Sequence, residues 1–109
     1  MTSRRRVVVL PEFFDRLDEL LPAERTATGR PSTADFALHD LTAIIDTLAD
    51  DYEGSTMPVP GTATRLLVTA GMTVSFAAIY VRVRADDTVE VLSLDLDERQ
   101  EGQRAFSDK

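Results

Sequence analysis

Residues 65–97 read RLLVTAGMTVSFAAIYVRVRADDTVEVLSLDLD. Three segments of this region are rich in apolar and β-branched residues, and we predict strands at 65–69, 74–84 and 89–96. The turn Ala70-Gly71-Met72 joins the first two, and the hairpin turn Asp86-Asp87 joins the last two. Strands joined by such short turns are antiparallel, so this region predicts a three-stranded meander.

A strand and two helices precede the meander. The run Arg6–Leu10 is β-branched and apolar, which predicts a strand, and Pro11 ends it and suits the first turn of a helix. Ser32 and Asp35 have the spacing of a capping box, which predicts the start of the longest helix, 32–52. We interpret residues 54–61, with two Gly and two Pro, as a linker loop. The expected apolar stripes are Phe13, Phe14, Leu17, Leu20 and Leu21 on the first helix, and Phe36, Leu41, Ile44, Ile45, Leu48 and Tyr52 on the second.

The order of these elements, β-α-α-β-β-β, predicts the fold class. We expect an α+β domain of two layers, with an antiparallel sheet and two helices packed on one face. A chain of 109 residues is long enough for one hydrophobic core without disulfides or metal. We therefore expect residues 1–109 to form a single domain, with 98–109 as a frayed tail.

Composition and charge narrow the functional classes. The net charge of −7 disfavours general nucleic-acid binding, because an acidic protein repels phosphate backbones. The absence of Cys excludes thiol catalysis, disulfides and thiolate metal sites. No apolar run approaches the roughly 20 residues of a membrane span, and the run after Arg4–Arg6 is too short for a secretory signal. We expect a cytoplasmic protein without a cofactor.

The meander resembles the RelE/ParE superfamily of toxins from bacterial type II toxin–antitoxin modules. Arg65-Leu66-Leu67-Val68 is similar to the first strand of the family's back half, residues 77–83 (AAIYVRV) to the second, and 88–94 (TVEVLSL) to the third. The order of elements is similar over the whole chain, and the amino-acid sequence is similar in detail over about 35 residues. It implies the fold given above, an antitoxin as partner, and a topoisomerase or the ribosome as target.

This sequence departs from the family where its ribonuclease members resemble one another. Those members carry a cluster of basic or proton-moving residues on the sheet, which stabilises the phosphate during cleavage. Ala77 stands where an Arg precedes the strand Tyr, and Leu96 and Asp97 stand at the final basic or His position. The remaining catalytic candidates are Arg65, Tyr80 and Arg82. A lone Tyr in a half-buried strand, such as Tyr80, more often serves packing than catalysis. Arg65 more often forms a structural ion pair with a helix carboxylate.

Two other groups of polar residues bear on function. His39 adjoins Asp40 and lies four residues after Asp35, so a metal site with one His and two Asp is conceivable, although adjacent helical positions do not share a face. A surface His is the alternative, and we assign no metal. The acids Asp46, Asp50, Asp51 and Glu53 gather at the end of the long helix, either as solvated surface or as a site for a basic partner.

The sequence therefore indicates a toxin-like component of a type II toxin–antitoxin module that acts by protein binding and not by RNA cleavage. The alternative is a small α+β structural or regulatory binding module without toxicity; a metal-dependent enzyme rests on His39 alone. Residues 54–84 contain three Arg and no acid, so we expect Arg65, Arg82 and Arg84 to line the surface that binds an acidic partner segment.

Overall fold

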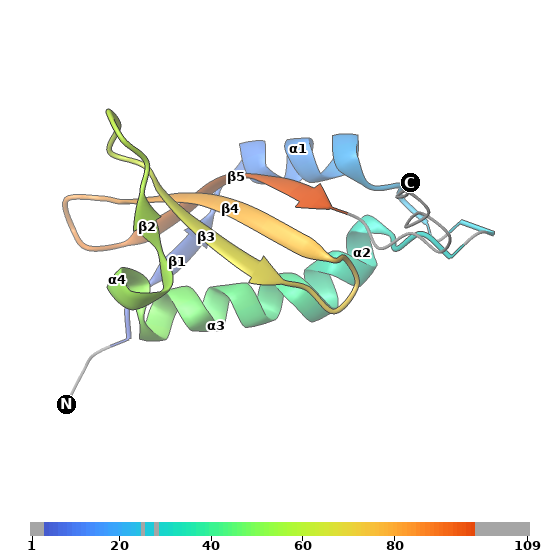
Figure 1. Ribbon diagram of the computed structural model, residues 1–109, viewed down its shortest axis with the longest axis horizontal. Coiled ribbons are helices and arrows are strands. Elements are labelled where there is room, and N and C mark those ends of the chain that lie inside the picture. The colour runs from blue at the N-terminus through green and yellow to red at the C-terminus, as the bar shows by residue number, and fades with distance from the viewer. Residues whose placement is uncertain (1–3, 25, 28, 98–109) are drawn as a thin grey trace, which may run out of the picture.

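The computed structural model describes residues 4–24, 26–27 and 29–97 and has an α+β fold, as the sequence predicts (Figure 1). The expected tail at 98–109 lies outside the described residues. In chain order, the elements are β1 (Val7–Val9), α1 (Pro11–Leu20), α2 (Thr33–Asp35), the π-helical segment η1 (Phe36–Leu41), α3 (Thr42–Asp50), α4 (Tyr52–Ser55), β2 (Met57–Pro58), β3 (Arg65–Ala70), β4 (Phe76–Val83) and β5 (Val89–Asp97).

One sheet holds the five strands in the order β1-β5-β4-β3-β2. The pairs β3–β4 and β4–β5 are antiparallel, which confirms the predicted meander. β1 pairs in parallel with β5, with Val8 opposite Glu90, so the sheet is mixed where a wholly antiparallel one was expected. The two strands are joined through all the other elements, and only a tight turn would have forced them to be antiparallel.

The expected long helix is interrupted in two places. The capping box at its start is present, with the Ser32 hydroxyl accepting from the Asp35 amide and the Asp35 carboxylate accepting from the Ser32 amide. The middle of the helix is π-helical, and this wider turn accompanies the burial of both Phe36 and Leu41, five residues apart. The helix ends at Asp50, because Asp51 leaves helical geometry and caps the next helix by accepting from the Gly54 amide.

The predicted loop at 54–61 was wrong in part. Residues 52–55 form the short helix α4, and Met57–Pro58 form the strand β2, which pairs with the start of β3. A two-residue strand containing Pro is an edge strand, since Pro has no amide proton to donate. Propensity alone does not predict such a strand; it depends on the neighbouring β3.

A single hydrophobic core joins the helices to alternate residues of the strands. On β4, Ile79 and Val81 are fully buried, whereas Phe76 of the other set is 53% exposed. α1 contributes Phe13 and Leu17 to the same core, and it packs along β5 (Figure 1). The alternation in the sequence is therefore realised as one buried and one open face of the sheet.

Within the described residues, no helix combines the length and the apolar character that crossing a membrane requires.

Candidate functional site

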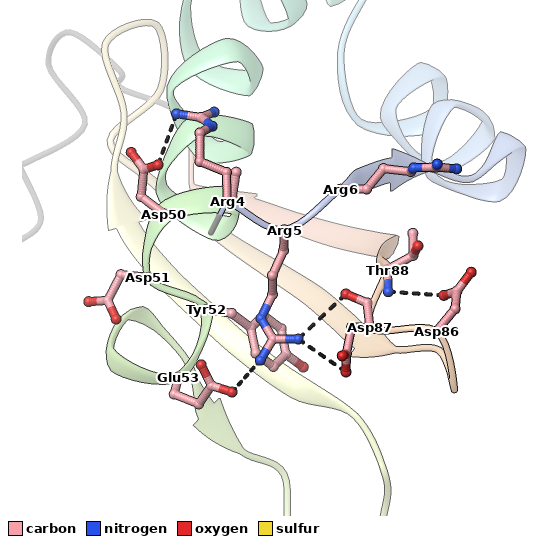
Figure 2. A pocket seen from close by; sticks show the side chains of 11 residues that line it. Arg4, Arg5, Arg6, Asp50, Asp51, Tyr52, Glu53, Asp86, Asp87 and Thr88 are labelled. Atoms are coloured by element: carbon pink, nitrogen blue, oxygen red, sulfur yellow. Dashed lines mark hydrogen bonds and ion pairs between the residues drawn. The ribbon is translucent and has the colours of Figure 1, made fainter. Parts of the chain in front are cut away.

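A cleft of about 650 Å³ lies where the residues before β1 meet the end of α3, helix α4 and the β4–β5 hairpin (Figure 2). Arg5 crosses this cleft. Its Nη2 lies 2.6 Å from Glu53 Oε2, and its Nη1 lies 3.6 Å from Asp87 Oδ1. Its guanidinium carbon lies 5.3 Å from the centroid of the Tyr52 ring, and its amide donates to the Ala49 carbonyl. Arg5 thus ties four segments together.

Charged side chains of this cleft form ion pairs with one another. Arg4 reaches Asp50 at 2.9 Å, while Arg6 points away from the cleft (Figure 2). Five acidic and three basic residues line it, which disfavours an anionic ligand. Burial raises the pKa of Tyr52, so the phenol is neutral near pH 7. We interpret the cleft as a structural contact region, where internal ion pairs hold the residues before β1 against α3, α4 and the β4–β5 hairpin.

The acidic helix end noted in the sequence therefore has its basic partner within the chain. Arg4 binds Asp50 and also Asp46, at 3.2 Å, and Arg5 binds Glu53. The sequence contained both halves of this arrangement, three Arg before an apolar strand and four acids near residue 50. What it lacked was the position of β1 beside α3, which is a tertiary contact.

Arg65 lies on the helix-facing side of β3, opposite the buried Val81. Its Nε donates to Thr56 Oγ1 at 2.6 Å and its Nη2 donates to the Thr56 carbonyl at 2.9 Å. The guanidinium carbon lies 5.7 Å from the centroid of the Tyr52 ring. Arg65 therefore holds the segment between α4 and β2 against the sheet, through hydroxyl and carbonyl oxygens.

Tyr80 lies on the open face of the sheet, opposite Ser93 on β5. Its hydroxyl donates to Asp95 Oδ2 at 3.2 Å, and Arg16 Nη2 lies 2.7 Å from the other oxygen of the same carboxylate. The hydrogen bond to Asp95 raises the pKa of Tyr80, because the carboxylate stabilises the protonated phenol. Tyr80 is therefore a hydrogen-bond donor at neutral pH, not a base.

Arg82 and Arg84 share one carboxylate. Arg82 Nε lies 2.7 Å from Glu90 Oε1, and Arg84 Nε lies 2.6 Å from Glu90 Oε2. The Glu90 side chain is only 10% exposed. Hydrogen bonds from Arg84 and Arg82 lower the pKa of Glu90, and the bond to Glu90 raises the pKa of Arg84. The group carries one net positive charge.

The structure does not bring the three catalytic candidates together. Arg65 is on the covered side of the sheet, and Tyr80 and Arg82 are on the open side. The latter two are directed to different carboxylates, those of Asp95 and Glu90. Of the expected partner-binding residues, Arg82 and Arg84 lie together and Arg65 lies apart from them.

The proposed metal ligands do not converge either. His39 is exposed, Asp35 belongs to the capping box, and the buried Asp40 faces the β3–β4 turn. Asp40 accepts from the amides of Met72 and Thr73, at 2.6 and 2.9 Å, and from the Thr73 hydroxyl at 2.5 Å. Among the described residues, no group of three or more His, Cys, Asp or Glu is placed to hold a metal ion.

The open face of the sheet presents apolar side chains to solvent. Val68 on β3 and Phe76 on β4 are 51% and 53% exposed, and Met57 on β2 is 56% exposed. Leu66 and Tyr80 lie on the same face and are half-buried. The Arg82–Glu90–Arg84 group lies towards one end of this face, at the β4–β5 hairpin. Such patches on small proteins mark interaction surfaces.

Comparisons with protein-family models, with curated proteins and with solved structures found no match to this chain.

Proposed function

We propose that this protein is a toxin-like component of a type II toxin–antitoxin module that acts by binding a partner polypeptide, without cleaving RNA. The observation that carries the proposal is the open apolar face around Val68 and Phe76, each about half exposed. Covering this face removes apolar area from water, at about 25 cal/mol per Å². A partner that covers this face gains binding free energy and is held at a defined place on the protein.

The charged end of the face defines the chemistry of the partner. Arg82 and Arg84 carry one more positive charge than Glu90 neutralises, in a chain whose net charge is −7. An amphipathic segment with apolar residues over Phe76 and a carboxylate near Arg82 complements this surface. We identify that segment with the antitoxin that the resemblance to the RelE/ParE superfamily implies.

The geometry of the candidate residues supports binding over RNA cleavage. Cleavage needs a cationic group and a proton-transfer group directed at one phosphate. Arg65, Tyr80 and Arg82 are divided between two faces of the sheet and are held by Thr56, Asp95 and Glu90 respectively. A topoisomerase is the target that fits a toxin without this chemistry. A binding module without toxicity would use the same face.

Copurification tests the surface. The tagged product of the adjacent gene should retain the wild-type protein. Phe76→Glu should weaken this retention more than about tenfold, because it places a charge in the apolar contact. Leu38→Glu is the matched control, since Leu38 is 69% exposed on η1, outside the face. Thermal melts of both variants establish that they fold.

Retention of Phe76→Glu together with loss of Leu38→Glu would move the interface to the helices. Induced expression without the adjacent gene separates the two functions. Growth arrest that the partner reverses supports the toxin, and unchanged growth with intact copurification supports the binding module.

A further inference from the structure

The outer edge of β3 is only partly paired. β2 pairs with Leu66 and Arg65, through Met57 and Pro58. In the part of the chain that the structure describes, β3 then continues to Ala70 with no strand on that side. The unpaired edge is therefore short, and it lies between the end of β2 and the β3–β4 turn.

The peptide groups that this edge presents follow from two hydrogen bonds. Gly71 N donates to Ser75 O across the β3–β4 hairpin, and Val59 N donates to Thr64 O on the opposite side. The direction of the N–H and C=O groups alternates from residue to residue along an antiparallel strand. Those of the even-numbered residues of β3 therefore point away from β4. The N–H and C=O groups of Val68 and Ala70 are thus directed outward.

The unpaired part of this edge lacks charge, Pro and bulges, three of the devices that prevent strands from pairing with other chains. Residues 66–81 contain no charged residue and no Pro, in a chain that is 28% charged. The register of β3 against β4 runs without a bulge from 65 to 70. Natural edges are usually blunted by charge, Pro or bulges. An edge without them is suited to strand addition.

A groove of about 110 Å³ runs beneath the edge, between α3 and β3. Its lining includes the small side chains of Ala43 and Thr47 from α3 and Thr69 from β3, together with the larger ones of Ile44, Leu67 and Met72. Ala43 and Thr47 are exposed, so α3 leaves room beside the strand. A strand added to β3 would direct alternate side chains into this groove and the others towards the open face.

We propose that the occupant is a second copy of this chain, with the two β3 strands paired antiparallel about a two-fold axis at Thr69. Val68 then lies opposite Ala70 of the second copy and exchanges two main-chain hydrogen bonds with it, and symmetry repeats them. Thr69 faces Thr69 of the second copy in a non-hydrogen-bonded pair, a favourable cross-strand combination. The pairing fills the gap between Leu66, which β2 occupies, and the turn at Gly71.

Charge favours a second copy as the occupant. Two chains of net charge −7 repel each other wherever acidic surfaces meet, and the charge-free segment 66–81 is where they approach with least repulsion. An edge that pairs about a two-fold axis is also self-complementary by geometry. The dimer uses main-chain groups at the edge of β3, whereas the proposed partner covers the side chains of Val68 and Phe76 on the open face.

Single-cysteine crosslinking tests the register, since the chain has no Cys. Thr69→Cys should form an interchain disulfide under mild oxidation, because the Cα atoms of a non-hydrogen-bonded pair are about 4.5 Å apart, within the range that a disulfide spans. Ala78→Cys, on the open face of the interior strand β4, is the control and should remain uncrosslinked. Sedimentation of the wild-type chain alone should give the mass of a dimer.

Thr69→Lys should raise the dissociation constant of the dimer more than about tenfold, since it places like charges directly opposite each other. A melt at low concentration establishes that this variant folds. A monomeric wild-type chain at all concentrations, or equal crosslinking at residue 78, overturns the proposal. Neither result affects the adjacent-gene copurification, so failure of the dimer is distinguishable from failure of the proposed function.

Discussion

At the scale of single residues, two buried carboxylates join separate elements, Asp40 across 32 and 33 residues of sequence and Glu90 within the β4–β5 hairpin. Asp40 is 4% exposed and accepts three hydrogen bonds from the β3–β4 turn. Glu90 is 8% exposed and is held by two Arg. Buried carboxylates are tolerated where donors replace water, and both side chains meet this condition.

Replacing Asp40 by Ala should lower the free energy of unfolding by about 2–3 kcal/mol, because the amides of Met72 and Thr73 lose a charged acceptor. The measurement is urea denaturation. Asp46→Ala is the control: Asp46 forms an exposed pair with Arg4, and its replacement should cost less than about 0.5 kcal/mol. Equal effects of the two substitutions would show that the turn does not depend on Asp40.

Glu90 should make stability depend on acidic pH. Its pKa is lower in the folded than in the unfolded chain, owing to Arg84 and Arg82. Its contribution is therefore complete above the unfolded pKa and is lost as the pH falls through the lower folded pKa. Denaturation from pH 7 to pH 3 should show the difference between wild type and Glu90→Gln shrinking towards the acid end. A constant difference would contradict this account.

At the scale of elements, the helical segment 33–50 depends on its first turn. The capping box satisfies two amides that helix geometry leaves without partners. Ser32 is also 6% exposed, so its amide and hydroxyl are remote from water. The π-helical turn follows directly, and it directs the Asp40 carboxylate to the β3–β4 turn. The start of this helix and the sheet are therefore coupled.

Ser32→Ala should lower the free energy of unfolding by about 1 kcal/mol, the usual contribution of a capping hydroxyl. Thr47→Ala is the comparison, because the exposed Thr47 hydroxyl donates to the Ala43 carbonyl of its own helix α3. Ala has the higher helix propensity, so that change should be neutral or slightly stabilising. Chemical denaturation of both variants gives the answer, and a neutral Ser32→Ala would mean that water replaces the cap.

At the scale of the whole molecule, the sheet separates residues that lie close in sequence. Arg65 and Leu66 are adjacent, yet they point to opposite faces, and the same holds for Tyr80 and Val81. A catalytic site that needs several side chains at one point therefore requires them to lie on the same face of the sheet, and not only on neighbouring strands.

This separation leads us to expect no RNA cleavage by the protein. After induced expression, primer extension on cellular messages should give the same pattern as an uninduced culture. Tyr80→Phe is the informative variant, because it removes only the hydroxyl that donates to Asp95. New cleavage sites that disappear in Tyr80→Phe would establish catalysis and would overturn the binding mechanism.

The meander strands and the start of the long helix follow from local patterns that can be seen in the amino-acid sequence. Alternation of apolar residues defines β3, β4 and β5, tight turns make them antiparallel, and the capping box defines the start of the long helix. These features need only neighbours within a few residues, which is why they can be predicted. The catalytic and partner residues were named from the same local patterns, without knowledge of their contacts.

Which groups of different elements meet depends on the tertiary structure. It set the parallel pairing of β1, the pairing of Arg4 and Arg5 with the acids near residue 50, and the sharing of Glu90 by two Arg. It also placed Arg65 on the covered side of the sheet, apart from Arg82. Such contacts depend on packing between segments up to 82 residues apart, as between Arg5 and Asp87. Many arrangements of the same elements satisfy the local patterns, and the shared core selects one.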